Sequence, residues 1–348
     1  MALTAKGLAE EQAWLITVSL IILAAVATAL ALSWTRPVMV PLVLATFVYY
    51  LVSPIAELLE SRLRFPRWAS TLVTLLLVAG GLVLLGLLVT TGARGLAASA
   101  DIYREKLLAW GVRLAQFLDG RGIDISQDAL VQSVQDLPMR GMLQATAGTA
   151  LTLVTNGTLV LIFVVFLLLG RNRELVRSRV FRQIDREIRR YLVVKFALSA
   201  VTGALVGIIL SLFGLELALV FGVLAFFLNF IPSVGSIVAT ILPLPLALVQ
   251  FDTAGPVIAI FVLTLLVQFA IGNVIDPKLM GKRLDLSPVT ILAALVFWGL
   301  LWGIVGMLLA APLTAILRIV LSEFQTTRVV ADLLAGRLPP AGQTPEFS

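Results

Sequence analysis

Long apolar runs without a single charge separate the charged residues of this chain. Eight such runs occur, at 12–35, 37–56, 68–93, 141–170, 196–215, 217–251, 253–275 and 286–317. Each reaches or exceeds the roughly 20 residues that a helix needs to cross a bilayer. Barrel strands would instead alternate apolar and polar residues over about 10 positions. The pattern therefore predicts an all-α polytopic membrane protein with about eight membrane segments.

Two of these runs are interrupted near their centres by residues that break helices. The sequence "IPSVGS" (231–236) divides the run 217–251, and "GLLWGIVG" (299–306) divides the run 286–317. The arms beside the first break would be about 21 to 23 Å long as helices, against a hydrocarbon core of about 30 Å. We therefore predict hairpins that enter and leave on one side, with tips shielded by protein or facing a wet cavity. Charge does not distinguish such hairpins from pairs of short crossings.

The two interruptions resemble copies of one unit. Leu224, Phe226 and Phe227 precede Val234 and Gly235 at the same offsets at which Leu295, Phe297 and Trp298 precede Val305 and Gly306. One ordinary span precedes each copy, at 196–215 and at 253–275, and the charge pattern predicts that these two spans run in opposite directions. An inverted repeat of this kind is typical of secondary transporters, which hold the substrate where the breaks meet.

Composition excludes several classes of function. The chain has 348 residues, of which 59% are hydrophobic and 13% charged, and it contains neither cysteine nor histidine. Thiol chemistry, His-ligated metal sites and Ser-His-Asp catalysis therefore lack their side chains. The GxxxxGK[ST] loop that binds ATP phosphates does not occur. We expect no enzymatic activity, no cofactor and no metal centre.

The net charge of +6 is concentrated in one loop. Nine basic residues stand against three acidic ones between Arg171 and Lys195, an excess equal to that of the whole chain. Such a cluster is typical of a cytoplasmic loop that contacts anionic lipid headgroups. Aromatic residues are not interleaved with it, so we expect no nucleic-acid partner.

Further basic loops predict the orientation and the division of the chain. Basic residues recur at 62–67, 278–283 and 318–337, which places both termini in the cytoplasm. The expected parts are an N-terminal scaffold of three helices (1–97), an extracytoplasmic amphipathic helical segment (98–145), a fourth helix with a basic linker helix (146–195), a transport core (196–322) and a cytoplasmic tail (323–348). In this topology the first two spans cross the membrane one after the other in opposite directions. Arg36, between them, is an anchor at the membrane interface.

Polar and helix-breaking residues inside the apolar runs are the candidate substrate-binding residues. They are Asn229, Pro232, Ser233, Gly235, Ser236, Gln268, Asn273, Gly303, Gly306 and Pro312. Asn229 has a side-chain dipole at the first break, where it either binds a polar solute or caps the broken helix. The hydroxyls of the break are either modest ligands or partners of loop amides.

Two acidic residues are candidates for ion coupling. Glu216 is isolated between two apolar spans, and Asp276 ends the run that contains Gln268 and Asn273. A carboxylate inside the membrane is a proton or sodium carrier by default. The alternatives are that Glu216 marks the water boundary and that Asp276 forms an interfacial ion pair with Lys278 or Lys282.

The C-terminal half also resembles a known family. "GNVIDPKLMGKRLDLSPVTILAALVFWGLLWGIVGMLLAAPLTAILRIVL", with "NFIPSVGSIVATILPLPLAL" upstream, is similar to the signature of the autoinducer-2 exporter family of bacterial inner-membrane permeases. The resemblance implies a transporter, often homo-oligomeric, that exports a small signalling molecule in some members and exchanges sodium for protons in others. Its pattern suggests that Gly281 and Lys282 form a cytoplasmic gate.

The expected function is therefore export of a small polar or signalling molecule across the inner membrane by alternating access, driven by the solute gradient or an ion. The alternative is a sodium(lithium)/proton antiporter, which needs a carboxylate that titrates near the working pH. A membrane scaffold without cargo would leave the two polar breaks unexplained.

Overall fold

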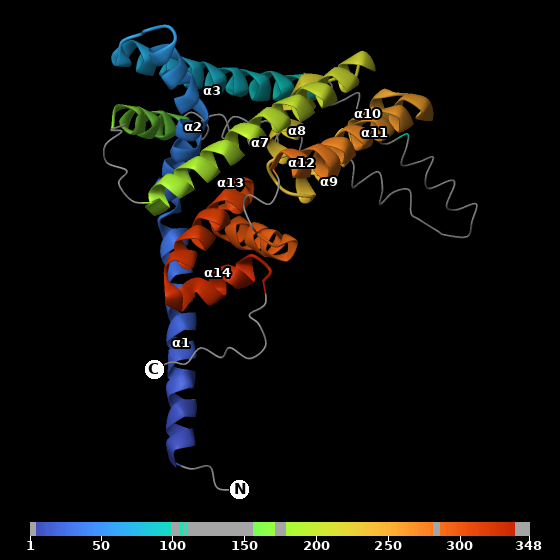
Figure 1. Ribbon diagram of the computed structural model, residues 1–348. Coiled ribbons are helices and arrows are strands. Elements are labelled where there is room, and N and C mark those ends of the chain that lie inside the picture. The colour runs from blue at the N-terminus through green and yellow to red at the C-terminus, as the bar shows by residue number, and fades with distance from the viewer. Residues whose placement is uncertain are drawn as a thin grey trace, which may run out of the picture.

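The computed structural model describes residues 5–98, 105–106, 109, 156–170, 179–280 and 286–337, and every regular element within them is helical (Figure 1). The long helices are α1 (Ala5–Trp34), α2 (Arg36–Ser61), α3 (Arg67–Ala98), α7 (Arg179–Leu212), α11 (Ala254–Phe269) and α13 (Pro288–Glu323). Each contains, alone or with the segment that continues it, a stretch long and apolar enough to cross a membrane. The prediction of an all-α polytopic membrane protein is confirmed.

Shorter helices complete the described parts. They are 156–169, α8 (Ala218–Leu228), α9 (Val234–Ile241), α10 (Leu244–Gln250), the π-helix η1 (Ala270–Ile275), α12 (Asp276–Met280), the 3-10 helix η2 (Gln325–Thr327) and α14 (Arg328–Leu334). Most of the predicted segment 98–145, the start of the basic linker, Gly281, Lys282 and the end of the tail lie outside the described residues. The predicted part boundaries therefore stay predictions.

The first two helices are arranged differently from the sequence expectation. The amide of Thr35 donates to the carbonyl of Ala31 at 2.9 Å, and the amide of Met39 donates to that of Thr35 at 2.9 Å. This helical hydrogen bonding continues across the junction because Pro37 lies in the first turn of α2, where proline is compatible with a helix. α1 and α2 therefore run end to end instead of crossing as an antiparallel pair (Figure 1).

The first interrupted run folds into a hairpin, here called hairpin 1, which comprises α8, α9 and α10. The side-chain amide of Gln250, at its end, donates to the carbonyl of Gly214 at 2.7 Å and accepts from the backbone amide of Glu216 at 2.8 Å. Both ends of the run therefore lie side by side, as the re-entrant prediction requires. At the tip, a Cβ added to Gly235 would lie 1.7 Å from the carbonyl oxygen of Leu228.

The second interrupted run, α13, also folds back on itself and is called hairpin 2. Gly303 has φ 66° and ψ −145° inside it, a conformation that only glycine adopts readily. The indole nitrogen of Trp298 donates to the hydroxyl of Thr314 at 3.1 Å, although in a straight helix 16 residues span about 24 Å. The two arms of α13 therefore lie against each other.

The two hairpins share details of their tips. A Cβ on Gly306 would lie 1.9 Å from the carbonyl oxygen of Trp298, much as Gly235 abuts Leu228. The Cβ added to Gly306 would lie 3.0 Å from the Cβ of Trp302, and the Cβ added to Gly235 would lie 3.2 Å from the Cβ of Ile231. Trp302 and Ile231 are corresponding residues of the two copies. This similarity supports the repeat that the sequence offsets predict.

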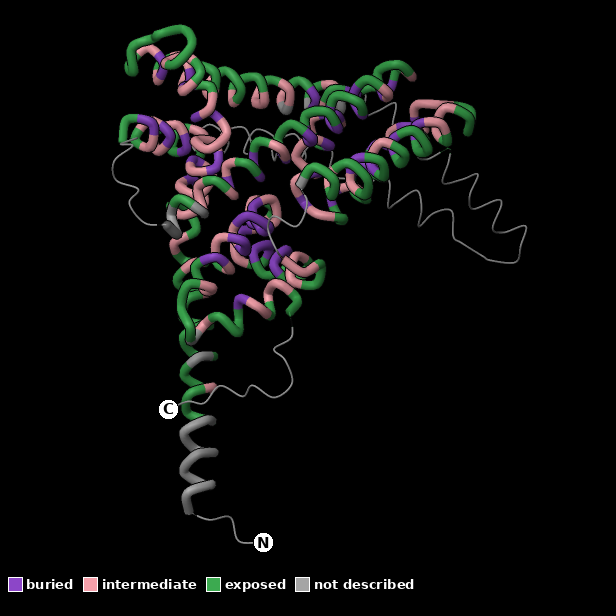
Figure 2. The backbone as a smooth tube through the Cα atoms, in the orientation of Figure 1, coloured by how far each residue is buried: buried purple, intermediate pink, exposed green. Residues whose placement is uncertain are grey.

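The hairpins approach from opposite ends of α7. Hairpin 1 follows the C-terminal end of α7, whereas Leu286, just before hairpin 2, packs with Ile188 and Tyr191 from its N-terminal half. Their tips meet in one apolar cluster, to which Ile231 of hairpin 1 and Trp298 and Trp302 of hairpin 2 belong. Figure 2 shows buried residues gathered in the bent α13, while the coloured part of α1 is largely exposed. The contact between the two tips is therefore apolar.

Glycines allow hairpin 1 to lie close against α7. A Cβ on Gly203 would lie 2.6 Å from the carbonyl oxygen of Gly222, and one on Gly222 would lie 2.8 Å from that of Gly203. Small residues at such crossings let helix backbones approach closely within a membrane. This close packing brings the tip of hairpin 1 beside the polar residues of α7.

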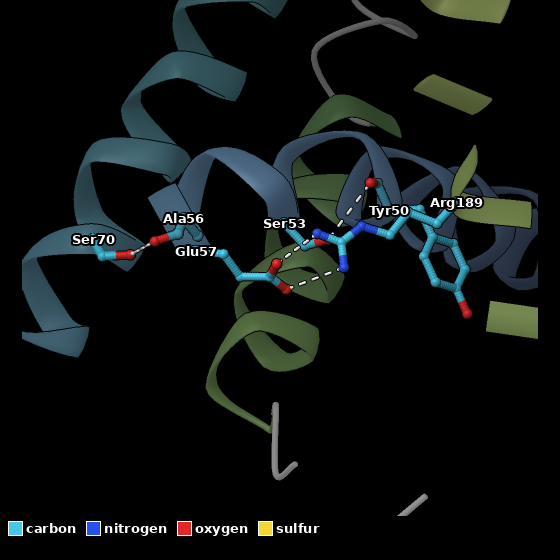
Figure 3. Close-up of polar contacts among 6 residues, drawn as sticks. All are labelled: Tyr50, Ser53, Ala56, Glu57, Ser70 and Arg189. Carbon is cyan, nitrogen blue, oxygen red and sulfur yellow. Dashed lines mark hydrogen bonds and ion pairs between the residues drawn. The ribbon is translucent and has the colours of Figure 1, made fainter. Parts of the chain in front are cut away.

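The end of α2 connects to two other helices (Figure 3). Both terminal nitrogens of Arg189 in α7 donate to the carboxylate of Glu57, at 2.7 and 3.2 Å. The hydroxyl of Ser70 in α3 donates to the carbonyl of Ala56 at 3.1 Å. The C-terminal end of α2, the start of α3 and the N-terminal part of α7 therefore lie on the same side of the protein.

We expect Glu57→Gln to lower the free energy of unfolding by about 1 kcal/mol or less, because both partners are about one third exposed. The loss should shrink at high salt, which screens such pairs. Unfolding in mixed micelles with increasing dodecyl sulfate, at low and high salt, measures it. Arg182→Gln, on an exposed site of α7, is the control. A salt-independent loss above about 2 kcal/mol would contradict this prediction.

Candidate functional site

A stripe of polar side chains lies buried between α7 and α11. On α7, Lys195, Ser199 and Thr202 are at most 4% exposed, and their spacing of four and three places them on one helical face. α7 and α11 are antiparallel, because Lys195 contacts Asp276 while Val206 and Leu210 pack with Ile260. Thr264 and Gln268 of α11 are likewise at most 3% exposed. We call these residues, with Asn229 and Asp276, the polar stripe.

Asn229 joins the polar stripe from the tip of hairpin 1. It is 4% exposed, and its side-chain nitrogen donates to the hydroxyl of Ser199 at 3.0 Å. The amide side chain thus links hairpin 1 to α7. Of the two expectations for this residue, this geometry fits a place in a polar site better than a helix cap, because the side chain bonds another helix.

Gln268 carries the most distinctive feature of the polar stripe. Its side-chain nitrogen and oxygen are both buried and have no hydrogen-bond partner among the described residues. Leaving a buried polar group unpaired costs about 1–3 kcal/mol, so such groups are rare in folded proteins and call for an explanation. A bound polar ligand would satisfy both atoms.

The polar stripe ends in a buried ion pair. The ammonium of Lys195 lies 2.7 Å from Oδ2 of Asp276, with side-chain exposures of 5% and 18%. The other carboxylate oxygen, Oδ1, is buried without a partner among the described residues. Asp276 follows the π-helix η1, an element often found at functional sites.

Lys195 is the functional candidate that the sequence reasoning missed. In the sequence it stands as the last residue of the basic loop, and the nearest lysines to Asp276 are Lys278 and Lys282. Lys278 is exposed, and Lys282 lies outside the described residues. The available signal was its position four residues before Ser199 and four after Tyr191, which places a lysine on the buried face of the helix.

The other candidates near the polar stripe differ in their burial. The hydroxyl of Ser236 faces Gly272, at 3.6 Å from where a Cβ on that glycine would be. Pro232 is partly exposed and Ser233, with φ 59°, is exposed at the tip of hairpin 1. Asn273 is exposed. Gly235 is buried at the tip of hairpin 1, where a residue with a Cβ would clash with the carbonyl oxygen of Leu228.

The remaining candidates lie elsewhere. Gly306 and Pro312 are buried within hairpin 2, and a Cβ on Gly303 would lie 3.2 Å from a guanidinium nitrogen of Arg36. Arg36 therefore contacts the tip of hairpin 2. Glu216 is exposed at the base of hairpin 1, where its backbone amide bonds Gln250.

A separate groove runs along the other side of α7. It has a volume of about 600 Å³ and is lined by small and apolar residues, among them Ala200, Gly207 and Val223. No residue of the polar stripe lines it, so it differs from the site described above. No group of three or more carboxylate side chains that suits a divalent metal gathers within the described ranges.

Comparisons with known proteins identify relatives for this architecture. The sequence model described as "AI-2E family transporter" matches residues 20–326. "AI-2 transport protein TqsA" of Escherichia coli (strain K12) is 31% identical over 314 residues, which cover 86% of this chain and 89% of that protein.

Two further relatives are similar over different lengths. The "Putative transport protein" of Haemophilus influenzae is 30% identical over 85% of this chain and 90% of its own length. YhhT of Escherichia coli (strain K12), with the same description, is 36% identical over 44% of this chain and 43% of its own length. This chain therefore belongs to the AI-2E transporter family, and it is a multi-pass helical membrane transporter rather than an enzyme.

Proposed function

We propose that this protein is a secondary transporter that exports a small polar or signalling molecule across the bacterial inner membrane by alternating access. The observation that carries the proposal is the buried side-chain amide of Gln268 in the polar stripe, which has no hydrogen-bond partner in the described part of the chain. The amide offers a donor and an acceptor together, which suits a solute with hydroxyl or carbonyl groups. The name of TqsA, a relative along most of the chain, refers to transport of AI-2.

Alternating access would use the two hairpins as opposite gates. Their bases lie toward opposite ends of α7, and their tips meet in the apolar cluster that contains Ile231 and Trp302. A tilt of hairpin 1 would uncover Asn229 and Gln268 from one side, and a tilt of hairpin 2 would uncover them from the other. An apolar contact suits such motion because it separates without leaving hydrogen bonds unpaired.

Gln268→Leu and Asn229→Leu are expected to lower solute export at least about tenfold, corresponding to about 1.4 kcal/mol or more of lost interaction. Export is measured as uptake of labelled solute into everted vesicles, whose cytoplasmic face points outward, with candidate solutes tested in turn, and assembly is measured by gel filtration in detergent. Thr74→Val is the matched control, because Thr74 is buried in α3, outside the polar stripe, and its hydroxyl donates to the carbonyl of Ser70 in its own helix. Unchanged export in both leucine variants would remove the polar stripe from the transport pathway.

A sodium(lithium)/proton antiporter is the second candidate function. The buried pair of Lys195 and Asp276 favours it, because ionisable residues inside a membrane mark ion pathways. In proteoliposomes with an entrapped pH dye, an antiporter changes the internal pH when sodium or lithium is added. An exporter without ion exchange leaves the dye unchanged.

The proposal also covers membrane partners and sidedness. Arg182, Arg186 and Arg190 are exposed at spacings of four along the N-terminal part of α7, which suits anionic lipid headgroups on the cytoplasmic side. Both termini are proposed to lie on that side. The exposed apolar surface of α1 is available to lipid or to a second copy in a homo-oligomer.

A further inference from the structure

We propose that Gln268, Gly272 and Asp276 form a binding site for a monovalent alkali cation, and that the ammonium of Lys195, which lies on Oδ2 of Asp276, competes with the cation for this carboxylate. The inference rests on the proposed transport function, for which it supplies the coupling ion. The cation would replace Lys195 at the carboxylate, so that occupancy of the site releases α7 from the segment that follows α11.

Three oxygen acceptors lie on one face of this segment. Gln268, Gly272 and Asp276 are spaced by four residues, which keeps them on one side of the helix. The side-chain oxygen of Gln268 and Oδ1 of Asp276 are both buried without a partner among the described residues. The hydroxyl of Ser236 in hairpin 1 faces the same position at Gly272.

The π-helix supplies the backbone acceptor. The amide of Asp276 donates to the carbonyl of Ile271, five residues back, instead of to Gly272. The next amide that would reach the Gly272 carbonyl in a π-helix belongs to residue 277, which is proline and has no N–H. The carbonyl of Gly272 is thereby left without its usual helical donors. Carbonyl and carboxylate oxygens are the ligands that hard cations prefer.

The charge of the site fits a single positive charge. Asp276 is the one acidic side chain in it, and Lys195 now balances that charge at 2.7 Å. A divalent ion would leave an uncompensated positive charge inside the membrane, which is costly. A monovalent cation that displaces Lys195 would keep the carboxylate neutralised and would satisfy the free acceptors as well.

The test measures cation binding to the purified protein in detergent without solute. Binding of radioactive sodium and the melting temperature are recorded in sodium, lithium and choline chloride at equal ionic strength, since a ligand that binds only the folded state stabilises it. Lys195→Met removes the tethered competitor and is expected to bind the cation at least about tenfold more tightly. Asp276→Asn is expected to abolish binding, and Gln268→Leu to weaken it.

The controls separate a binding site from a structural ion pair. Arg189→Met breaks a different ion pair of α7 and should leave cation binding as in the unchanged protein. If Asp276→Asn alone does not fold, the double variant Lys195→Met/Asp276→Asn takes its place, because it leaves the site without a net charge. This double variant should not bind the cation. Lys195→Met binding no more tightly than the unchanged protein, or binding that survives without Asp276, overturns the proposal. Solute export that persists while cation binding fails would overturn this site and leave the proposed transport function standing.

Discussion

Gly235→Ala is expected to lower the free energy of unfolding by more than about 4 kcal/mol, a range reached only by severe clashes or losses of buried partners. The added Cβ would lie 1.7 Å from the carbonyl oxygen of Leu228, which no side-chain rotation relieves because both atoms belong to the main-chain framework. Hairpin 1 would have to open at its tip and move Asn229 away from Ser199. Unfolding with dodecyl sulfate in mixed micelles, together with the yield of folded protein, measures the effect.

Two other glycines show whether the effect belongs to hairpin closure. Gly306→Ala should behave like Gly235→Ala, because its Cβ would lie 1.9 Å from the carbonyl oxygen of Trp298. Gly80→Ala, inside α3 where an added Cβ meets no other described part of the protein within 4 Å beyond its own helix backbone, should be neutral or stabilising by up to about 1 kcal/mol. Equal effects of Gly80→Ala and Gly235→Ala would show that the tight hairpin tip is not how this protein folds.

The two hairpins were predictable because their signals are local. Glycine, proline and serine inside an apolar run stand out without knowledge of any distant residue, and arms of about 15 residues are too short to cross a bilayer easily. The repeat was visible as well, since Gly235 and Gly306 follow matched apolar residues. The close approach of each glycine to a carbonyl gives a physical reason for that residue at that place.

The partners of the polar residues were not predictable in the same way. Lys195 and Asp276 are 81 positions apart, and nothing near either residue in the sequence indicates the other. Charge counting favoured the neighbouring lysines of Asp276 instead. The antiparallel packing of α7 against α11 decides the pairing, and that packing depends on the whole C-terminal half of the chain.

The course of α1 and α2 was missed for another reason. An arginine followed by a proline between two apolar runs resembles a loop at the membrane surface, but proline in the first turn of a helix does not interrupt it. Arg36 contacts the tip of hairpin 2, and the indole nitrogen of Trp302 donates to the carbonyl of Leu32 at 3.1 Å. These contacts hold the junction of α1 and α2 against hairpin 2.

Breaking the ion pair of the polar stripe is expected to have the second large effect. Lys195→Met, in choline salt, should lower the free energy of unfolding by about 3–5 kcal/mol, because it leaves the carboxylate of Asp276 buried without its partner. Lys195→Met/Asp276→Asn should recover most of that loss, since replacing both charges removes the desolvation cost together with the attraction. Unfolding of the single and double variants in a double-mutant cycle gives the coupling energy.

The pair of Arg189 and Glu57 provides the comparison for that cycle. Its side chains are about one third exposed, so the corresponding coupling should be about 1 kcal/mol or less. A coupling between Lys195 and Asp276 as small as that would mean that water reaches the pair in the folded protein. In that case the polar stripe is already open on the side of Asp276, and release of Lys195 cannot be the step that opens it.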